Sequence, residues 1–292
     1  DKGFESYSSL HQWSVNNPGE FWSRAWDDNS VIGSKGSIFF KEGADFISSQ
    51  FFPEARLNVA ENLLAHGEPD QVAIVSILET GVRSEITWAE LRIKVAATAA
   101  AMRAEGVVSG DRVVAWVPNV AETVIYALGA LSIGAVVSTA SPDFAPHAVE
   151  DRFGQVEPKI LLAVDGYYYN GKYFDCAEKS AEIEKLLPTL KKSVRISQFD
   201  EWIKPFMGSA ANYEQLPFDH PGFVLFSSGT TGKPKCITHS GAGVMLKAQS
   251  ELLYQFNITK GNKVFFFTTC GWMMWNWLTM ALGRGATIVL FD

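Results

Sequence analysis

The chain has 292 residues, of which 47% are apolar and 20% are charged, close to the average of globular proteins. This composition excludes a disordered tail, a collagen-like chain and a coiled coil, and the length is typical of about two domains or subdomains. The formal net charge of −7 argues against a protein that binds nucleic acid or an anionic membrane through its overall field. We therefore expect any polyanion to be bound at a local site.

The cysteines and histidines predict neither disulfides nor a metal site. The three cysteines, Cys176, Cys236 and Cys270, are odd in number and far apart, with no C-x-x-C pair. The five histidines show no metal-binding spacing such as H-E-x-x-H. Free cysteines are typical of a reducing compartment, so we expect a cytoplasmic protein.

Two stretches without a charged residue, 123–142 and 264–283, resemble membrane spans at first sight. Both contain internal glycines and neither has a flanking cluster of Lys or Arg. Buried helix–strand pairs explain them better than a bilayer does, so no membrane span is predicted. The chain begins without a Met and stops just after a strand-like run, and we interpret both ends as cuts in a longer protein.

The chain order predicts an α/β fold in three parts. Residues 1–70 are rich in aromatic side chains without a clear period, which predicts a lead-in segment that packs on a larger body. Within 71–215, strands and helices alternate as in βαβ units, which predicts a parallel sheet flanked by helices and a first α/β subdomain. The predicted strands are 72–78, 112–117, 135–139, 159–164 and 194–197. The predicted helices are 121–133, 147–156, 176–187 and one that begins after Thr87, three residues before Glu90, and stops at Gly106.

A second alternating unit, within 216–292, follows a looser segment that spans about 198–222. The predicted strands here are 223–226, 263–268 and 286–291, with a helix over 241–255. The loop 227–235 between the first of these strands and the helix is the most informative part of the sequence.

This loop combines glycines, hydroxyl groups and lysines directly after an apolar strand. Glycine lets the backbone approach a ligand closely, hydroxyl groups donate hydrogen bonds, and lysine supplies positive charge. A surface turn would explain two or three such residues, but nine in this order after a strand favour a loop that wraps a phosphate chain. The predicted phosphate-binding residues are Ser227, Ser228, Gly229, Thr230, Thr231, Gly232 and Lys233.

The loop is not a Walker A motif. Ser227 stands where that motif needs its first glycine, and Pro234 follows Lys233 where Ser or Thr would bind magnesium. A kinase or nucleotidase of the P-loop type is therefore disfavoured.

The loop resembles the Ser/Thr/Gly-rich phosphate loop of the adenylate-forming, or acyl-activating, superfamily. The segment 51–64 is similar to the N-terminal signature of its acetyl-CoA-synthetase branch, and 110–113 and Pro118-Asn119 also match that branch. The resemblance implies the N-terminal part of the large domain of an enzyme that joins a carboxylate to AMP, releases pyrophosphate and passes the acyl group to a thiol. It implies ATP, Mg and CoA as substrates, with no tightly bound cofactor.

The segment 269–277 helps with the choice of acid. Where the acetyl enzymes have D-x-G-W followed by G-H, this chain has Thr269 in place of the Asp, keeps Gly271-Trp272, and has Trp275-Asn276 in place of the Gly-His. This variant resembles the acetoacetate–CoA ligases, which implies acetoacetate as the acid and an acyl pocket lined by Gly271, Trp272, Trp275 and Asn276. By composition alone, a Met/Trp run more often packs as a buried helix face.

A weaker match concerns CoA. Relatives have a loop with two Arg for the nucleotide end of CoA, and Tyr169 and Lys172 fall at those places. A solvated Tyr/Gly turn is an equally good interpretation. The family's adenine, ribose and mobile-lysine motifs would lie beyond Asp292, so no catalytic residue is assigned.

The resemblance thus implies that the full-length protein activates acetoacetate with ATP to acetoacetyl-AMP and transfers it to CoA. Two alternatives stay open at this point. One is a ligase for another short acid, such as acetate or propionate, and the other is a non-catalytic nucleotide- or acyl-binding fragment.

Overall fold

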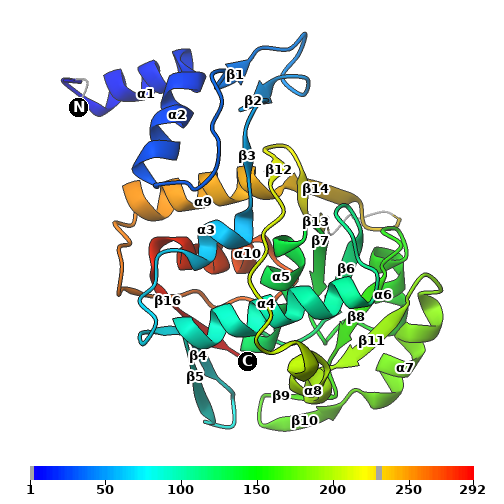
Figure 1. Ribbon diagram of the computed structural model, residues 1–292. Helices are drawn as coiled ribbons and strands as arrows, with labels where there is room; N and C mark the ends of the chain where they lie inside the picture. Colours follow the sequence, from blue (N-terminus) through cyan, green and yellow to red (C-terminus); the bar gives the residue numbers. More distant parts are fainter. Residues whose placement is uncertain (1–2, 228–231) are drawn as a thin grey trace.

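The computed structural model describes residues 3–227 and 232–292 (Figure 1). In this part of the chain, two larger sheets, of six and four strands, have helices around and between them, and three further sheets have two strands each. The predicted α/β fold with parallel sheets flanked by helices is therefore confirmed.

The first sheet has the strand order β11-β8-β6-β7-β13-β14 within the described residues. Neighbouring strands in this sheet are parallel, except that β14 runs antiparallel to β13. The strands are β6 (Arg112–Trp116), β7 (Val136–Ala140), β8 (Ile160–Ala163), β11 (Lys192–Arg195), β13 (Pro221–Phe226) and β14 (Cys236–Ser240).

Helices cover both faces of this sheet, as buried strands of a parallel sheet require. On β6, Val113 and Ala115 belong to the core shared with α4 (Trp88–Ala104) and α5 (Ala121–Ser132). The alternate residues, Val114 and Trp116, belong to a second core with α6 (Pro146–Phe153) and α7 (Ala177–Leu186). The predicted capping box at the start of α4 is present, since Thr87 and Glu90 bond each other's backbone N–H.

The second sheet has the order β15-β16-β4-β5. The strands β15 (Lys263–Phe265), β16 (Thr287–Phe291) and β4 (Val72–Ile77) are parallel, and β5 (Arg83–Thr87) is antiparallel to β4. The helices α9 (Gly241–Tyr254) and α10 (Met273–Met280), followed by a 3₁₀ turn at Ala281–Arg284, share the larger core with it. Both sheets take strands from either side of residue 215, and the three-part division stays a prediction.

The lead-in segment contains α1 (Tyr7–Asn16), α2 (Pro18–Asp28), β1 (Phe40–Lys41), β2 (Gln50–Phe51), β3 (Arg56–Leu57) and α3 (Val59–Leu64). Its first part, from α1 to β2, lies along one side of this body, whereas α3 lies among the helices of the body and is mostly buried (Figure 1). No residue of α1 is buried, whereas Trp26 of α2 packs with Phe52 and Phe218 at ring distances of 5.2 and 6.4 Å. The short strand β12 (Leu216–Pro217) pairs with β3 and joins the lead-in to the first sheet.

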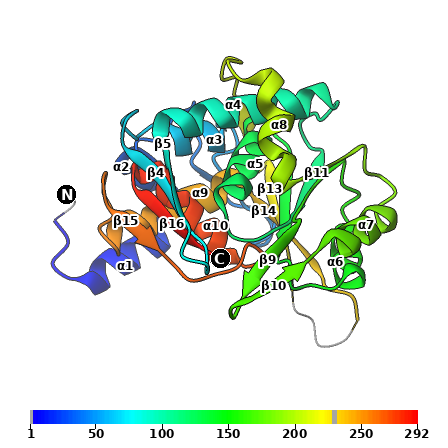
Figure 2. The same cartoon turned by 90° about the horizontal axis from the view of Figure 1, so that it is seen from below.

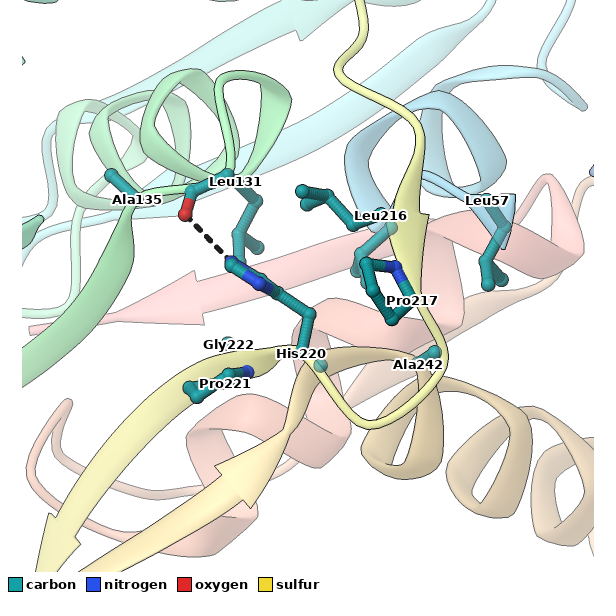
Figure 3. Close-up of a pocket in the computed structure, with 12 residues that line it drawn as sticks. Leu57, Leu131, Ala135, Leu216, Pro217, His220, Pro221, Gly222 and Ala242 are labelled. Atoms are coloured by element: carbon teal, nitrogen blue, oxygen red, sulfur yellow. Dashed lines mark hydrogen bonds between the residues drawn. The ribbon is translucent and has the colours of Figure 1, made fainter. Parts of the chain in front are cut away.

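His220 closes the junction between β12 and the first sheet (Figure 3). Its Nε2–H donates to the carbonyl of Gly134 at 2.8 Å, next to a cavity of only about 20 Å³. That space holds about one water molecule, so this cavity is a packing gap and not a substrate site.

Several short elements were not predicted. Among them are β5, β14, the hairpin of β9 (Gly166–Tyr169) and β10 (Lys172–Asp175), α8 (Phe199–Ile203), and the 3₁₀ turns Ile196–Gln198 and Lys204–Phe206. The strands β5, β10 and β14 are largely exposed, so their sequences lack the apolar pattern by which strands are recognised. Among the described residues, no helix is both long and apolar enough to cross a membrane.

Asn58 ties the lead-in to the body. Its side chain is fully buried, its Nδ2 donates to the carbonyls of Leu131, Ser132 and Glu214 at 2.9–3.1 Å, and its Oδ1 accepts the N–H of Glu61 at 3.2 Å. We expect Asn58→Ala to lower the free energy of unfolding by at least about 3 kcal/mol, because it leaves buried carbonyls and a helix N-terminus without partners.

Urea denaturation measures this loss. Asn16→Ala is the matched control, because Asn16 is an exposed asparagine whose side chain accepts one hydrogen bond from Gln12. Similar midpoints for the two variants would contradict the role given to Asn58.

Candidate functional site

The candidate site lies at the carboxyl end of the first sheet. From β6 the chain passes through α5 to β7, and from β7 it passes through α6, on the opposite face, to β8. The crevice where the connections diverge in this way is where open α/β sheets bind ligands. Because β13 is parallel to β7, the loop that follows β13 starts at the same edge.

The loop predicted to bind phosphate lies between two antiparallel strands. Phe226 of β13 is paired with Cys236 of β14, at the two ends of this loop. At the base of the loop, Ser227 N–H donates to the carbonyl of Lys235 at 3.0 Å, and Lys235 N–H donates back to Ser227 Oγ at 3.2 Å. Gly232 has φ +93°, a conformation that favours glycine. The predicted residues Ser228, Gly229, Thr230 and Thr231 lie outside the described residues.

The far arm of the loop lies against α6. Lys233 Nζ is 3.4 Å from Asp151 Oδ1, and Gln155 Nε2 donates to the carbonyl of Pro234 at 2.9 Å. The Lys233 side chain is 71% exposed, so its ion pair is weak. The lysine can therefore exchange this carboxylate for a phosphate at little cost.

Gly271 and Trp272 lie across the end of β7. A Cβ on Gly271 would come within 3.6 Å of the backbone N of Ser141 and 3.7 Å of Ala140 Cα. The preceding residue is anchored, since Thr139 Oγ1 donates to the carbonyl of Cys270 at 2.5 Å. The structure thus brings the Gly-Trp pair and the base of the phosphate loop to the same edge of the sheet, with the Trp272 side chain 67% exposed.

Trp275 and Asn276 differ from this pair, because both are buried in the first turn of α10, with exposures of 1% and 3%. The Trp275 indole N–H donates to Asn119 Oδ1 at 3.0 Å. Their place in the acyl pocket stays a prediction, and Thr269, Trp272 and Met273 are the exposed side chains of this segment. Met273, 38% exposed beside Trp272, was not predicted, because nothing in its sequence context separates it from the buried Met and Trp residues around it.

In the sequence, Asn119 is notable only as part of the match of Pro118-Asn119 to the family, yet in the structure it connects four segments. Besides accepting from Trp275, its Nδ2 donates to the carbonyl of Thr268 at 3.3 Å and its backbone N–H donates to Asp292 Oδ1 at 3.2 Å. Burial raises the pKa of Asp292 to about 6, although the hydrogen bond from Asn119 acts in the opposite direction. With this pKa, the Asp292 carboxyl is half protonated at about pH 6 and mostly ionised above it.

Tyr169 and Lys172 face each other across the turn of the β9–β10 hairpin, as register partners, and both are exposed. They lie on a different element from the phosphate loop, and their contact with CoA stays a prediction. Burial holds the pKa of the Cys270 thiol well above its usual range, so this cysteine is not a nucleophile. Over 3–227 and 232–292, no group of three or more His, Cys, Asp and Glu residues is arranged to bind a metal ion.

Comparison with known proteins places the chain in a family. A family model described as AMP-binding enzyme matches residues 64–292, and one described as acetyl-coenzyme A synthetase N-terminus matches residues 7–63. The chain belongs to the AMP-binding enzyme family.

Several similar proteins are acetoacetyl-CoA synthetases. Acetoacetyl-coenzyme A synthetase of Rhizobium meliloti is 42% identical over 309 residues, and the match covers 100% of this chain and 47% of the relative. The acetoacetyl-CoA synthetase of Xenopus tropicalis is 41% identical, with 98% and 46% covered. A solved structure of acetoacetyl-CoA synthetase from Streptomyces lividans superposes with a TM-score of 0.92 at 37% identity, covering 99% of this chain and 46% of that one. The predicted resemblance is confirmed, and the chain spans about half the length of the curated relatives it matches.

The two tryptophans at the site should differ in what they contribute to stability. We expect Trp275→Ala to lower the free energy of unfolding by about 3–5 kcal/mol, because it empties a buried indole site. Trp272→Ala, at an exposed position, should change it by no more than about 0.5 kcal/mol. Urea denaturation followed by circular dichroism measures both, and equal losses would contradict the separation of the two side chains.

Proposed function

We propose that the full-length protein is an acetoacetate–CoA ligase, of which this chain forms the N-terminal part. The observation that carries the proposal is the alignment over nearly the whole chain, at 38–42% identity, with acetoacetyl-CoA synthetases from bacteria and vertebrates. The Gly271-Trp272 pair at the carboxyl end of β7 supports it, because this edge is where a substrate would meet the phosphate loop.

In the proposed reaction, a carboxylate oxygen of acetoacetate attacks the α-phosphorus of Mg-bound ATP, and pyrophosphate leaves. The CoA thiol then attacks the acyl carbonyl of acetoacetyl-AMP, a thioester bond forms, and AMP leaves. Since positioning and charge stabilisation supply most of the acceleration of phosphoryl chemistry, we assign to Ser227–Lys233 the binding of the ATP phosphates. The three free cysteines fit a cytoplasmic location, which we also propose.

Another relative narrows the class of acid. Malonamoyl-CoA synthetase vrtB of Penicillium aethiopicum is 34% identical over 315 residues. The acyl groups in the names of both kinds of relative carry a second carbonyl at the β position, as a ketone in acetoacetyl and as an amide in malonamoyl. We therefore propose that the site recognises a β-carbonyl oxygen, with the exposed Thr269 as its hydrogen-bond donor.

Lys233 should act in the first half-reaction. In the full-length protein, we expect Lys233→Ala to slow acetoacetate-dependent pyrophosphate exchange about 10- to 150-fold, because a hydrogen bond to a charged group contributes about 1.5–3 kcal/mol. Lys235→Ala is the control, because this lysine is also exposed and in the same loop but lies outside the residues assigned to phosphate binding.

An unchanged exchange rate in Lys233→Ala would reject the role of this lysine. Absence of exchange in the unmutated full-length protein would instead favour a non-catalytic binding protein.

Acid selectivity tests β-carbonyl recognition. A missing methylene changes kcat/KM by about 10- to 200-fold, whereas a missing hydrogen-bonding group changes it by more. We expect the full-length protein to prefer acetoacetate and malonamate over butyrate by more than this range. Thr269→Val should reduce the preference, and Thr269→Ser, which keeps the hydroxyl, should retain it.

The measurement is kcat/KM for acetoacetate, malonamate, butyrate and acetate in the three proteins. Equal use of butyrate and acetoacetate by the unmutated protein would remove β-carbonyl recognition, and higher efficiency with acetate would assign the protein to another short-chain acid.

A further inference from the structure

The β9–β10 hairpin has little support of its own. It forms a two-stranded sheet, and all four residues of β10 are exposed. A cavity of about 340 Å³ separates it from the β4–β5 hairpin, with Tyr167, Tyr168 and Tyr173 on one side and residues of β4 and β5 on the other. Because an isolated two-stranded hairpin is marginally stable in water, the position of its turn depends on contacts outside it.

Such a contact comes from Glu79. Its carboxylate accepts the backbone N–H of Asn170 at 2.8 Å and that of Gly171 at 3.0 Å. These two residues form the turn of the β9–β10 hairpin and have φ of +51° and +72°. Successive N–H groups in a turn form a concave site for an anion, and a carboxylate makes strong, charge-assisted hydrogen bonds there.

Glu79 is itself well placed to hold the turn. It lies in the connection between β4 and β5, and its own N–H donates to the carbonyl of Asp292 at 2.5 Å. In the same connection, the N–H of Gly81 donates to the carbonyl of Leu78 at 2.8 Å. Figures 1 and 2 show the tip of the β4–β5 hairpin beside β9 and β10 in both views. The carboxylate therefore extends from the second sheet and fixes a turn that projects beyond the first.

We propose that Glu79 is a positioning residue for CoA. Tyr169 and Lys172 directly flank the turn that Glu79 binds, as register partners, so the carboxylate sets the place of both side chains. The inference rests on the proposed function and on the nucleotide end of CoA as the ligand of this hairpin. Glu79 does not touch the substrate, and it acts only through the backbone of Asn170 and Gly171.

The kinetic test separates the two half-reactions, because pyrophosphate exchange precedes the entry of CoA. In the full-length protein, Glu79→Ala should raise the KM for CoA roughly 2- to 30-fold, by analogy with the 0.5–2 kcal/mol that side-chain caps of backbone N–H groups contribute. The exchange rate and the KM values for ATP and acetoacetate should stay as they are. Glu79→Gln keeps one carbonyl acceptor but loses the charge, so its KM for CoA should lie between those of the unmutated protein and Glu79→Ala.

Glu85→Ala is the matched control. Glu85 is an exposed glutamate of the same β4–β5 hairpin, but its carboxylate pairs with Arg83 and not with the β9–β10 turn. It should leave the KM for CoA unchanged.

Hydrogen exchange of the Asn170 and Gly171 amides gives a readout that does not depend on activity. It should be faster in Glu79→Ala than in the unmutated protein or in Glu85→Ala. Unchanged exchange at these amides would overturn the contact, and faster exchange with an unchanged KM for CoA would overturn the positioning role. If the unmutated protein forms acyl-AMP but no acyl-CoA, the proposed function itself fails, and that result is visible without any variant.

Discussion

The buried amide of Asn119 is the contact on which the geometry of the site depends. Asn119 follows β6, and its side chain accepts from Trp275 in α10 and donates to the carbonyl of Thr268 after β15. Its backbone N–H donates to Asp292 after β16. One residue thus couples the carboxyl end of the first sheet to the carboxyl ends of two strands in the second. Because an unpaired buried indole or amide is costly, these segments have little freedom to move apart.

This coupling explains the different environments of neighbouring side chains in the Gly-Trp segment. Trp275 is buried and its indole N–H donates to Asn119, whereas Trp272 and Met273, three and two residues earlier, are exposed. Gly271 lies against the end of β7, where a Cβ would make ordinary van der Waals contact with Ala140 and Ser141. Neighbouring apolar residues of similar type therefore differ in burial: Trp275 packs in the core, whereas Trp272 and Met273 are exposed.

The sequence predicted those parts of the fold in which burial imposes a clear pattern. The apolar strands β4, β6, β7 and β8 and the capped helix α4 were identified because each has a strong local signal. The strands β5, β10 and β14 gave no such signal, because each is the exposed second strand of a hairpin and so lacks an apolar pattern. The same limit applies at the site: the loop composition of 227–235 was informative, whereas the roles of Asn119 and Glu79 depend on contacts with distant segments.

The second sheet also has a consequence for how the chain folds during synthesis. Ile74 of β4 pairs in parallel with Ile288 of β16, so β4 is made long before its neighbour exists, whereas β6, β7 and β8 follow one another closely. Until β16 emerges, the apolar strand β4 has only the hairpin partner β5 on one edge, and its other edge is open. Parallel pairing over such a separation is slow, and an open apolar edge invites association with other chains. We therefore expect the first sheet to form early on the ribosome and the second to complete late, with chaperones acting in the interval.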